Sequence, residues 1–295
     1  MRDYLVRATA NNTTIRAFAT VTTETVQKAH LIHETSHVAS AALGRTLTAA
    51  VMMGGMMKDE GNSVTIQIKG DGPLGGIVVV SDSKLNVRGY VYNPAVDLPL
   101  NDLGKLDVAS AVGKNGYMNV IKDLGLKEPY IGYVNLVSGE IGEDIAYYFA
   151  FSEQIPSVVS LGVLVDADGS IINAGGYIIQ LLPGADEGVI DFLENKIRTV
   201  KPVTALLSEG KSPEDILDII LGEKGLEILE TAPCSYTCNC SRDRMERNLL
   251  SLGEKEIMEM IEEQHGAELS CHFCNNKYYF TEEQLLNLIH QGKEG

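Results

Sequence analysis

The sequence predicts an α+β protein with three parts: an N-terminal domain over residues 1–183, a helical linker over 184–233 and a small C-terminal domain over 234–295. Three observations indicate this. Short β-rich runs alternate with helical segments through the first 180 or so residues, which favours helices packed on a largely antiparallel sheet. After Pro183-Gly184 the apolar residues recur at helical spacing. Four of the five cysteines then form two short pairs near the C-terminus.

The N-terminal domain is expected to begin with a β-hairpin. Residues 4–8 and 14–20 are rich in β-forming residues and flank Asn11-Asn12, a turn signal. Residues 23–57 follow as a helical stretch with a potential break near residues 33–36.

The remaining elements of this domain are expected to be mostly strands. Gly- and Asp-rich turns separate the first three of them, which is typical of a meander. The strands are expected over residues 64–69, 77–81, 87–92, 130–137, 158–165 and 171–182, with a helix over 143–151.

The linker is acidic and is expected to be helical. It carries eleven acidic and five basic residues, a net charge of −6. Ser212-Pro213 predicts a helix N-terminus, and Gly222 predicts its end. Helical spacing appears in Val189, Leu193 and Ile197, and in Ile216, Leu217, Ile220 and Leu221. Helices this short depend on what they pack against, so the segment is either an ordinary helical connector or a conditionally folded switch.

The C-terminal domain is expected to need a metal for its fold. Its helices are predicted over residues 241–250 and 254–263, followed by a strand over 277–280 and a helix capped by Thr281 with Gln284 reaching back. Sixty-two residues give only a small apolar core. Small domains of this size usually require a metal or disulfides.

The cysteine spacing predicts one zinc site. The pairs are Cys238-Asn239-Cys240 and Cys271-His272-Phe273-Cys274, separated by thirty residues. Two such pairs facing each other supply the four soft ligands of a tetrahedral Zn²⁺ site. We therefore expect Cys238, Cys240, Cys271 and Cys274 to hold one Zn²⁺ per chain.

The same site predicts sensitivity to oxidants. Four thiolates around Zn²⁺ carry a formal charge of −2, which neighbouring basic residues would partly offset: Arg242, Arg244, Arg247 and Lys277. Thiolates are the form of cysteine that oxidants attack. Disulfides within the pairs would close loops of a few residues only, whereas the metal joins two arms across thirty residues. Losing the metal should therefore release the fold between them and loosen residues 184–233.

Two residues near the site have open roles. Cys234 is either a bystander or an auxiliary thiol that exchanges with Cys238. His272 either replaces a ligand or supports the ligands from outside the metal's first coordination shell.

A glycine-rich turn resembles a nucleotide-binding motif but is predicted to be a hairpin. Gly70-Asp71-Gly72-Pro73-Leu74-Gly75 matches the dinucleotide pattern. That chemistry requires a following helix, and here the β-rich residues 77–80 follow. A β-hairpin is the expected structure.

One histidine motif supplies the enzyme alternative. His33-Glu34-Thr35-Ser36-His37 matches the zinc metalloprotease pattern, with His30 at helical spacing before it. If a helix begins at Ser36, the two histidines of the motif do not share a helix face, as the metalloprotease site requires. The primary expectation is therefore that the protein is not an enzyme.

The charge and hydropathy of the chain bear on partners and location. The net charge is −16, and residues 234–295 carry −5, so phosphate-rich nucleic acid and anionic membrane are disfavoured partners. Neither an apolar export segment nor a membrane-spanning stretch is recognisable. We expect a cytoplasmic protein whose cysteines meet a reducing environment.

The cysteine arrangement resembles that of the 33-kDa chaperonin family, redox-regulated heat-shock holdase chaperones of bacteria. The resemblance covers essentially the whole chain. Other matching stretches are Ala41-Ala42-Leu43-Gly44-Arg45-Thr46, Gly70-Asp71-Gly72-Pro73, Gly104-Lys105-Leu106-Asp107, Ser152-Glu153-Gln154, Gly175-Gly176 and Gln180-Leu181-Leu182-Pro183-Gly184.

The resemblance implies a substrate-binding N-terminal domain, a metastable linker and a redox-switch zinc domain. It implies that the reduced, zinc-bound form is an inactive monomer or weak dimer. Oxidation would form the disulfides Cys238–Cys240 and Cys271–Cys274, release zinc and favour an active homodimer. This dimer would hold thermally unfolding and oxidatively damaged client proteins without ATP. Cys234 lies outside the family's four-cysteine pattern.

Overall fold

The computed structural model describes residues 2–294, with side chains described as far as residue 290, and it divides into two compact units. The boundary lies between Thr237 and Cys238. Residues 184–233 pack within the first unit, and their separate role as a linker stays a prediction. The α+β class expected from the sequence is confirmed.

The first unit contains a five-stranded sheet in which all neighbouring strands are antiparallel. The strand order is β10-β1-β2-β9-β8. The predicted N-terminal hairpin is confirmed as β1 and β2. The strands are β1 (Tyr4–Ala10), β2 (Ile15–Val21), β8 (Ser157–Val165), β9 (Ile171–Leu181) and β10 (Glu227–Pro233).

A six-stranded sheet forms the second layer of strands. Its order is β11-β5-β4-β3-β6-β7, antiparallel except where β11 runs parallel to β5. The predicted meander is confirmed as β3, β4 and β5, and the glycine-rich turn joins the first two of these strands. The strands are β3 (Ser63–Lys69), β4 (Ile77–Asp82), β5 (Asn86–Val91), β6 (Tyr117–Asp123), β7 (Tyr130–Asn135) and β11 (Ser235–Tyr236).

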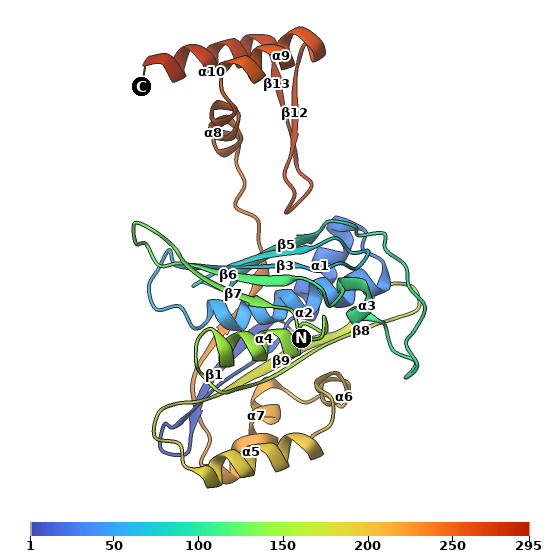
Figure 1. The fold of residues 1–295 in the computed structure, drawn as a ribbon, viewed down its shortest axis with the longest axis vertical. Helices are drawn as coiled ribbons and strands as arrows, with labels where there is room; N and C mark the ends of the chain where they lie inside the picture. Colours follow the sequence, from blue (N-terminus) through green and yellow to red (C-terminus); the bar gives the residue numbers. More distant parts are fainter. Residues whose placement is uncertain (1, 295) are drawn as a thin grey trace. The chain divides into compact units, whose positions relative to one another are not determined.

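The central helix of the first unit, α2 (His37–Gly54), is buried along almost its whole length. It packs against strands of both sheets and so lies between them (Figure 1). The close approach depends on small residues. A side chain at Gly44 would meet Val26 and Val163 at less than 3 Å. Around α2 lie α1 (Thr23–His33), α3 (Val108–Val112) and α4 (Gly142–Phe151).

Three short helices cover the other face of the five-stranded sheet. They are α5 (Glu187–Thr199), α6 (Val203–Ser208) and α7 (Pro213–Leu221), followed by a 3₁₀ turn over Gly222–Lys224. Apolar residues of α7, such as Leu217 and Ile220, are buried against Ala17 and Ala19 of β2 and their neighbours. Figure 1 shows this helical layer on the side of the sheet opposite α2. These helices therefore bury much of the apolar face on this side of the sheet.

The predicted break near residues 33–36 is confirmed. Glu34 ends α1 in a left-handed conformation, with a φ of 50°, and the side chain of Ser36 caps α2 by accepting a hydrogen bond from the Ala39 N–H at 3.2 Å. The N-terminal cap of α7 is confirmed too, since Ser212 and Asp215 form reciprocal hydrogen bonds.

The second unit contains three helices and a hairpin. The predicted helix cap is confirmed, because Thr281 and Gln284 exchange hydrogen bonds at the start of the last helix. Sequence analysis missed the first strand of the hairpin. The elements are α8 (Arg242–Leu252), α9 (Glu254–Gln264), β12 (Gly266–Ser270), β13 (Lys277–Thr281) and α10 (Glu282–Glu294).

Candidate metal centre

The structure brings the four predicted cysteine ligands together in the second unit. The Sγ atoms of Cys238, Cys240, Cys271 and Cys274 all lie within 4.8 Å of one another. Two of these separations are 3.7 Å, from Cys238 to Cys271, and 3.4 Å, from Cys240 to Cys274. A tetrahedron of thiolates with metal–sulfur bonds of about 2.3 Å has sulfur–sulfur edges of about 3.8 Å. The four thiols therefore fit a tetrahedral metal ion.

Local backbone structure places each pair. Cys238 and Cys240 come directly before α8, whose first turn is capped by Ser241. Cys271 and Cys274 lie in the tight turn between β12 and β13, where the Cys274 and Asn275 N–H groups donate to the Cys271 carbonyl oxygen. A left-handed conformation at Asn275, with a φ of 57°, lets this turn close. Each pair of sulfurs is thus presented on a short, locally determined segment.

Tyr278 contacts the site directly. Its hydroxyl group donates a hydrogen bond to the Cys240 Sγ atom at 3.1 Å. Burial raises the pKa of the Cys240 thiol, but hydrogen bonds from Tyr278 and the neighbouring thiols outweigh burial and lower this pKa to about 7. By contrast, burial raises the pKa values of Cys238 and Cys274. The four thiols are therefore inequivalent, and Cys240 ionises most readily of these three.

The thiols are part of the second unit's small core. Cys271 is buried with Leu249, Ile257, Phe280 and Leu285, and the other three cysteines pack against this cluster. The core is therefore built around the sulfur atoms. A metal that holds them would directly stabilise the packing of α8, α9 and the hairpin.

Two of the four basic residues near the cysteines, Arg242 and Lys277, have other partners. Arg242 forms an ion pair with Glu246 and lies over the Phe280 ring, while Lys277 forms an ion pair with Glu268. Their charges are thus partly compensated away from the thiols, which limits the offset of cluster charge expected from the sequence.

Cys234 and His272 lie outside the four-sulfur group. Cys234 belongs to the first unit, where its buried thiol lies near the Thr20 hydroxyl and the Val21 carbonyl oxygen. Burial and the charge of Asp3 raise its pKa to about 12. His272 is exposed on the turn between the hairpin strands. Neither residue is among the candidate ligands found in the described part of the chain.

The histidine motif does not form a metal site. His33 ends α1 and contacts the Tyr236 hydroxyl group at 3.0 Å, whereas His37 begins α2 and contacts the Ala167 carbonyl oxygen at 3.2 Å. Within residues 2–294, the group of cysteines is the candidate metal site. The metalloprotease alternative therefore has no support in the geometry.

The sequence and the fold match known proteins over their whole length. A family model described as Hsp33 protein matches residues 3–281. The chain belongs to the Hsp33 family. A 33 kDa chaperonin of Acetivibrio thermocellus is 60% identical over 289 residues, covering 98% of this chain and 97% of the relative. A 33 kDa chaperonin of a Thermoanaerobacter species is 54% identical and is covered completely.

A solved structure shows the same Hsp33 fold. The crystal structure of the 33 kDa chaperonin (heat shock protein 33 homolog) from Thermotoga maritima has a TM-score of 0.91 and 38% sequence identity, with complete coverage of both chains. The family resemblance drawn from the sequence is confirmed by these matches.

Sequence analysis of this Hsp33-family chain missed Tyr278. The residue lies in a strand-like run, and no local spacing links it to Cys240, thirty-eight positions earlier. Its position two residues before the buried Phe280, on the same strand face, was the available signal. In the described part of the chain, no helix is long and apolar enough to cross a bilayer.

Proposed function

We propose that this protein is a redox-regulated, ATP-independent holdase chaperone. The reduced, zinc-bound form is inactive, and oxidation activates it to protect thermally unfolding and oxidatively damaged proteins from aggregation. The observation that carries the proposal is the meeting of four Sγ atoms from two arms thirty residues apart. Relatives named 33 kDa chaperonins, alike over their full length, support a chaperone rather than an enzyme.

The metal in this proposal is one Zn²⁺ per chain, held by Cys238, Cys240, Cys271 and Cys274. Four thiolates in tetrahedral reach are a typical donor set for structural zinc. When bound, zinc keeps the sulfurs ionised and links the two arms. Structural zinc contributes about 10–16 kcal/mol of apparent folding free energy in small domains. A core of this size would therefore lose its fold with the metal.

The redox step consumes two equivalents of peroxide. For each equivalent, two thiols lose two protons and two electrons to form one S–S bond, and one hydrogen peroxide molecule is reduced to two water molecules. We propose the pairs Cys238–Cys240 and Cys271–Cys274. Proximity alone does not select them, because all four sulfurs lie within 4.8 Å. The proposed pairing is the one that leaves the two arms unconnected.

The client-binding surface in this proposal is the sheet face beneath α5, α6 and α7. These helices are short, and they belong to the acidic segment 184–233. Their release would expose a contiguous apolar surface centred on Ala17, Ala19 and Ile179. A large exposed apolar patch on a chain of net charge −16 is suited to holding unfolding proteins in solution.

The proposed assembly and location follow from the same family assignment. We propose a homodimer when the protein is oxidised and active, and a monomer or weak dimer when it is reduced. Clients are unfolding proteins of the cytoplasm. Nucleic acid and membrane are not proposed partners, because the acidic chain would repel their phosphate groups.

One set of samples tests the proposal. Bound zinc, free thiols and suppression of client aggregation are measured before and after peroxide treatment at raised temperature. The expected result is loss of one zinc and four thiols per chain together with gain of client protection. A protein that loses its zinc and four thiols without gaining protection would contradict the chaperone assignment. Peptide cleavage that is lost in His33→Ala would instead support a protease.

A further inference from the structure

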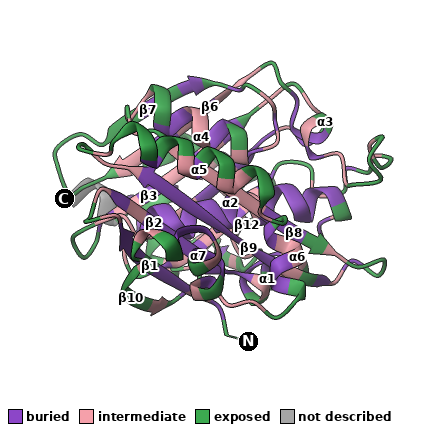
Figure 2. Cartoon of the chain, turned by 90° about the horizontal axis from the view of Figure 1, so that it is seen from below, coloured by how far each residue is buried: buried purple, intermediate pink, exposed green. Residues whose placement is uncertain are grey.

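Strand β10 (Glu227–Pro233) is a weakly held edge strand. It pairs with β1 only, and a bulge interrupts the pairing between Arg7 and Ala8. Six of its seven residues are exposed, including Ile228 and Leu229, and Ala232 is half-buried. Figure 2 shows β10 beside β1, coloured mostly as exposed and intermediate. Main-chain hydrogen bonds therefore hold this strand more than side-chain packing does.

The pairing leaves a cavity of about 500 Å³ beside the strand. Ala232 lies directly opposite Leu5 of β1, and Ala232 and Pro233 are the small residues that β10 places at this cavity. The apolar wall is formed by Leu5, Phe18, Met56, Met57 and Leu85. The protein's own strand thus underfills an apolar space next to it.

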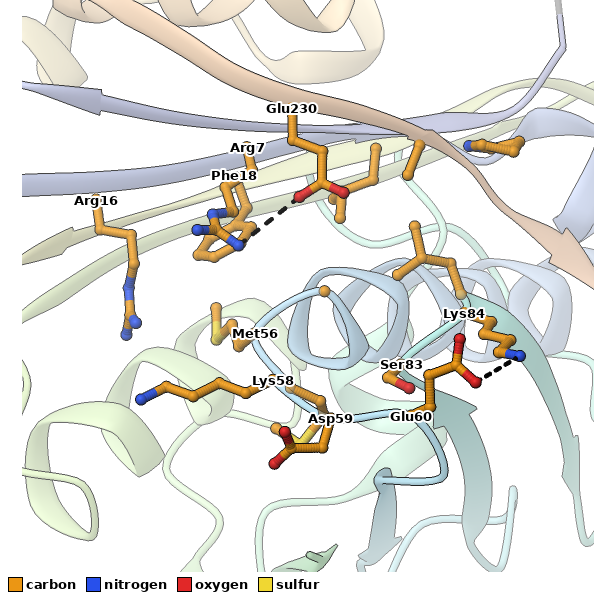
Figure 3. A pocket seen from close by; sticks show the side chains of 16 residues that line it. Arg7, Arg16, Phe18, Met56, Lys58, Asp59, Glu60, Ser83, Lys84 and Glu230 are labelled. Atoms are coloured by element: carbon orange, nitrogen blue, oxygen red, sulfur yellow. Dashed lines mark ion pairs between the residues drawn. The ribbon is translucent and has the colours of Figure 1, made fainter.

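The cavity also has a positively charged side. Figure 3 shows Arg7, Arg16 and Lys58 at the cavity, with Glu230 of β10 reaching Arg7. Asp59, Glu60 and Lys84 line the cavity too, and Lys84 forms an ion pair with Glu60. The Arg7–Glu230 ion pair spans 3.7 Å, and both side chains are about half exposed. Arg16 donates two hydrogen bonds to the neutral Gln180 side chain. An acidic residue at the position of Glu230 therefore suits Arg7 and Arg16, while this exposed ion pair contributes little to the stability of β10 in the sheet.

We infer that the β1 edge is a client-binding site, occupied in the active protein by an extended client segment in the place of β10. The inference rests on the proposed function and adds to the proposed sheet face a second client contact, at the edge of the same sheet. The segment would pair antiparallel with β1, with a large apolar side chain at the position of Ala232 and an acidic one two residues before it. Its backbone would make the ladder hydrogen bonds, and its apolar side chain would fill the cavity that Ala232 leaves.

The chain itself shows why this edge becomes free on activation. β10 follows α7 through a short turn and precedes Cys238 by five residues, so it lies between the helical cover and the cysteine site in sequence. Loss of order in the helical cover would remove the constraint on its N-terminal end. Its C-terminal end continues into β11, which pairs with β5 and buries Tyr236, so the strand is released from its N-terminal end. The exposed β1 edge then presents unpaired backbone groups, which readily template another strand.

Hydrogen exchange of the full chain tests the site. The probe client is reduced, carboxymethylated α-lactalbumin, a permanently unfolded protein, and aggregation of a heat-unfolded client is measured on the same samples. We expect exchange in β1 to rise at least tenfold after peroxide and to fall again when the probe is added. Exchange in β8, the opposite edge of the same sheet, should not respond to the probe.

A matched pair of variants tests the cavity. Ala232→Leu should fill the cavity with the protein's own strand, so that exchange in β1 after peroxide is about tenfold slower than in the wild type. Thr231→Leu changes the neighbouring residue, which is exposed and does not line the cavity, and should behave as the wild type. Equal behaviour of the two variants would overturn the role of the cavity.

Peptides test the side-chain preference. The labelled peptide EILETLP, which is β10 with leucine at the position of Ala232, should bind the oxidised protein about tenfold more tightly than EILETAP. EILKTLP, with lysine at the position of Glu230, should bind more weakly than EILETLP. Equal affinities would overturn the proposed preference.

Three results would overturn the site while leaving the chaperone function intact, provided that aggregation is still suppressed. The first is a β1 strand that stays protected after peroxide, and the second is a β1 strand that stays open with the probe bound. The third is protection of β1 from hydrogen exchange that appears without any client and increases with protein concentration. That result would assign the edge to the β10 strand of a second copy. Failure to suppress aggregation in the zinc-free sample would instead refute the proposed function itself.

Discussion

The hydroxyl group of Tyr278 donates a hydrogen bond to the Sγ atom of Cys240 across 3.1 Å. This bond joins β13 to the cysteine pair before α8, so a residue outside the four-sulfur group helps to position one of the candidate ligands. Hydrogen bonds to ligand atoms orient them and tune their charge, and their loss commonly weakens metal binding 10–100-fold.

Tyr278→Phe is therefore expected to weaken zinc binding at least tenfold without removing a ligand. Competition with a colorimetric zinc chelator measures the change. The matched control is Tyr279→Phe, because Tyr279 is exposed and lies on the opposite face of the same strand. Equal zinc affinity in both variants would show that the hydroxyl–sulfur bond has no role at the site.

Removal of the metal is expected to unfold the second unit while the sheets of the first unit persist. The core of the second unit is small and includes the sulfur atoms, so packing alone leaves it marginal. After treatment with a strong chelator under reducing conditions, limited proteolysis should rapidly cleave the chain at sites throughout residues 238–290. Resistance of residues 238–290 to the protease after zinc loss would contradict the proposed switch.

Cys234 is expected to be a bystander in the reduced protein. Burial raises the pKa of this thiol to about 12, so it is protonated at neutral pH, and the buried sulfur is inaccessible to oxidants. Cys234→Ser should therefore keep the zinc content and the response to peroxide. Mass spectrometry of alkylated, folded protein should find Cys234 unmodified. Disulfides between Cys234 and Cys238 in oxidised protein would support the auxiliary-thiol alternative.

Ser212→Ala is expected to loosen the helical cover. The Ser212 side chain caps α7 at the Asp215 N–H, and loss of such a cap costs about 1 kcal/mol. The variant should therefore become active at a lower temperature or a lower peroxide dose than the wild type. Asp107→Ala, which removes the corresponding cap of α3 outside the helical cover, separates this effect from general helix destabilisation.

Acid is expected to loosen the same helix. Hydrogen bonds from Ser212 lower the pKa of Asp215 below that of the unfolded chain. The carboxylate's stabilising contribution is therefore fully present above the unfolded-state pKa, and it is lost as the pH falls through the lower, folded-state pKa. Protease sensitivity of residues 213–221 should rise below about pH 4. Asp215→Asn should show a smaller pH dependence of this sensitivity.

Much of the fold could be read locally from the sequence. Runs of β-forming residues between Gly- and Asp-rich turns identified β3 and β4, the Ser36 cap identified the break before α2, and the strand after the glycine-rich turn excluded a nucleotide loop. Strand β6 carries an alternation of apolar residues, at Met118 and Val120, that the sequence analysis did not use. Each of these signals arises within a few residues, where periodicity and capping act.

Strand β10 shows the limit of such local reasoning. Residues 227–233 carry no alternating pattern, and most of their side chains are exposed. They form a strand because β1 offers an unpaired edge, and that edge exists only when the sheet is assembled. The cavity beside Ala232 likewise depends on Leu5, Phe18 and Met56, which are distant in sequence.

By itself, the sequence determined the chemistry of this protein: two cysteine pairs at metal-binding spacing, a strongly acidic chain and short capped helices after Pro183. Those properties depend on residue type and on near neighbours. Only the tertiary structure decided that four sulfurs converge, that Tyr278 reaches Cys240 and that β10 closes the edge beside Arg7. These relationships join residues far apart in the chain, and burial of the shared core fixes which of them meet.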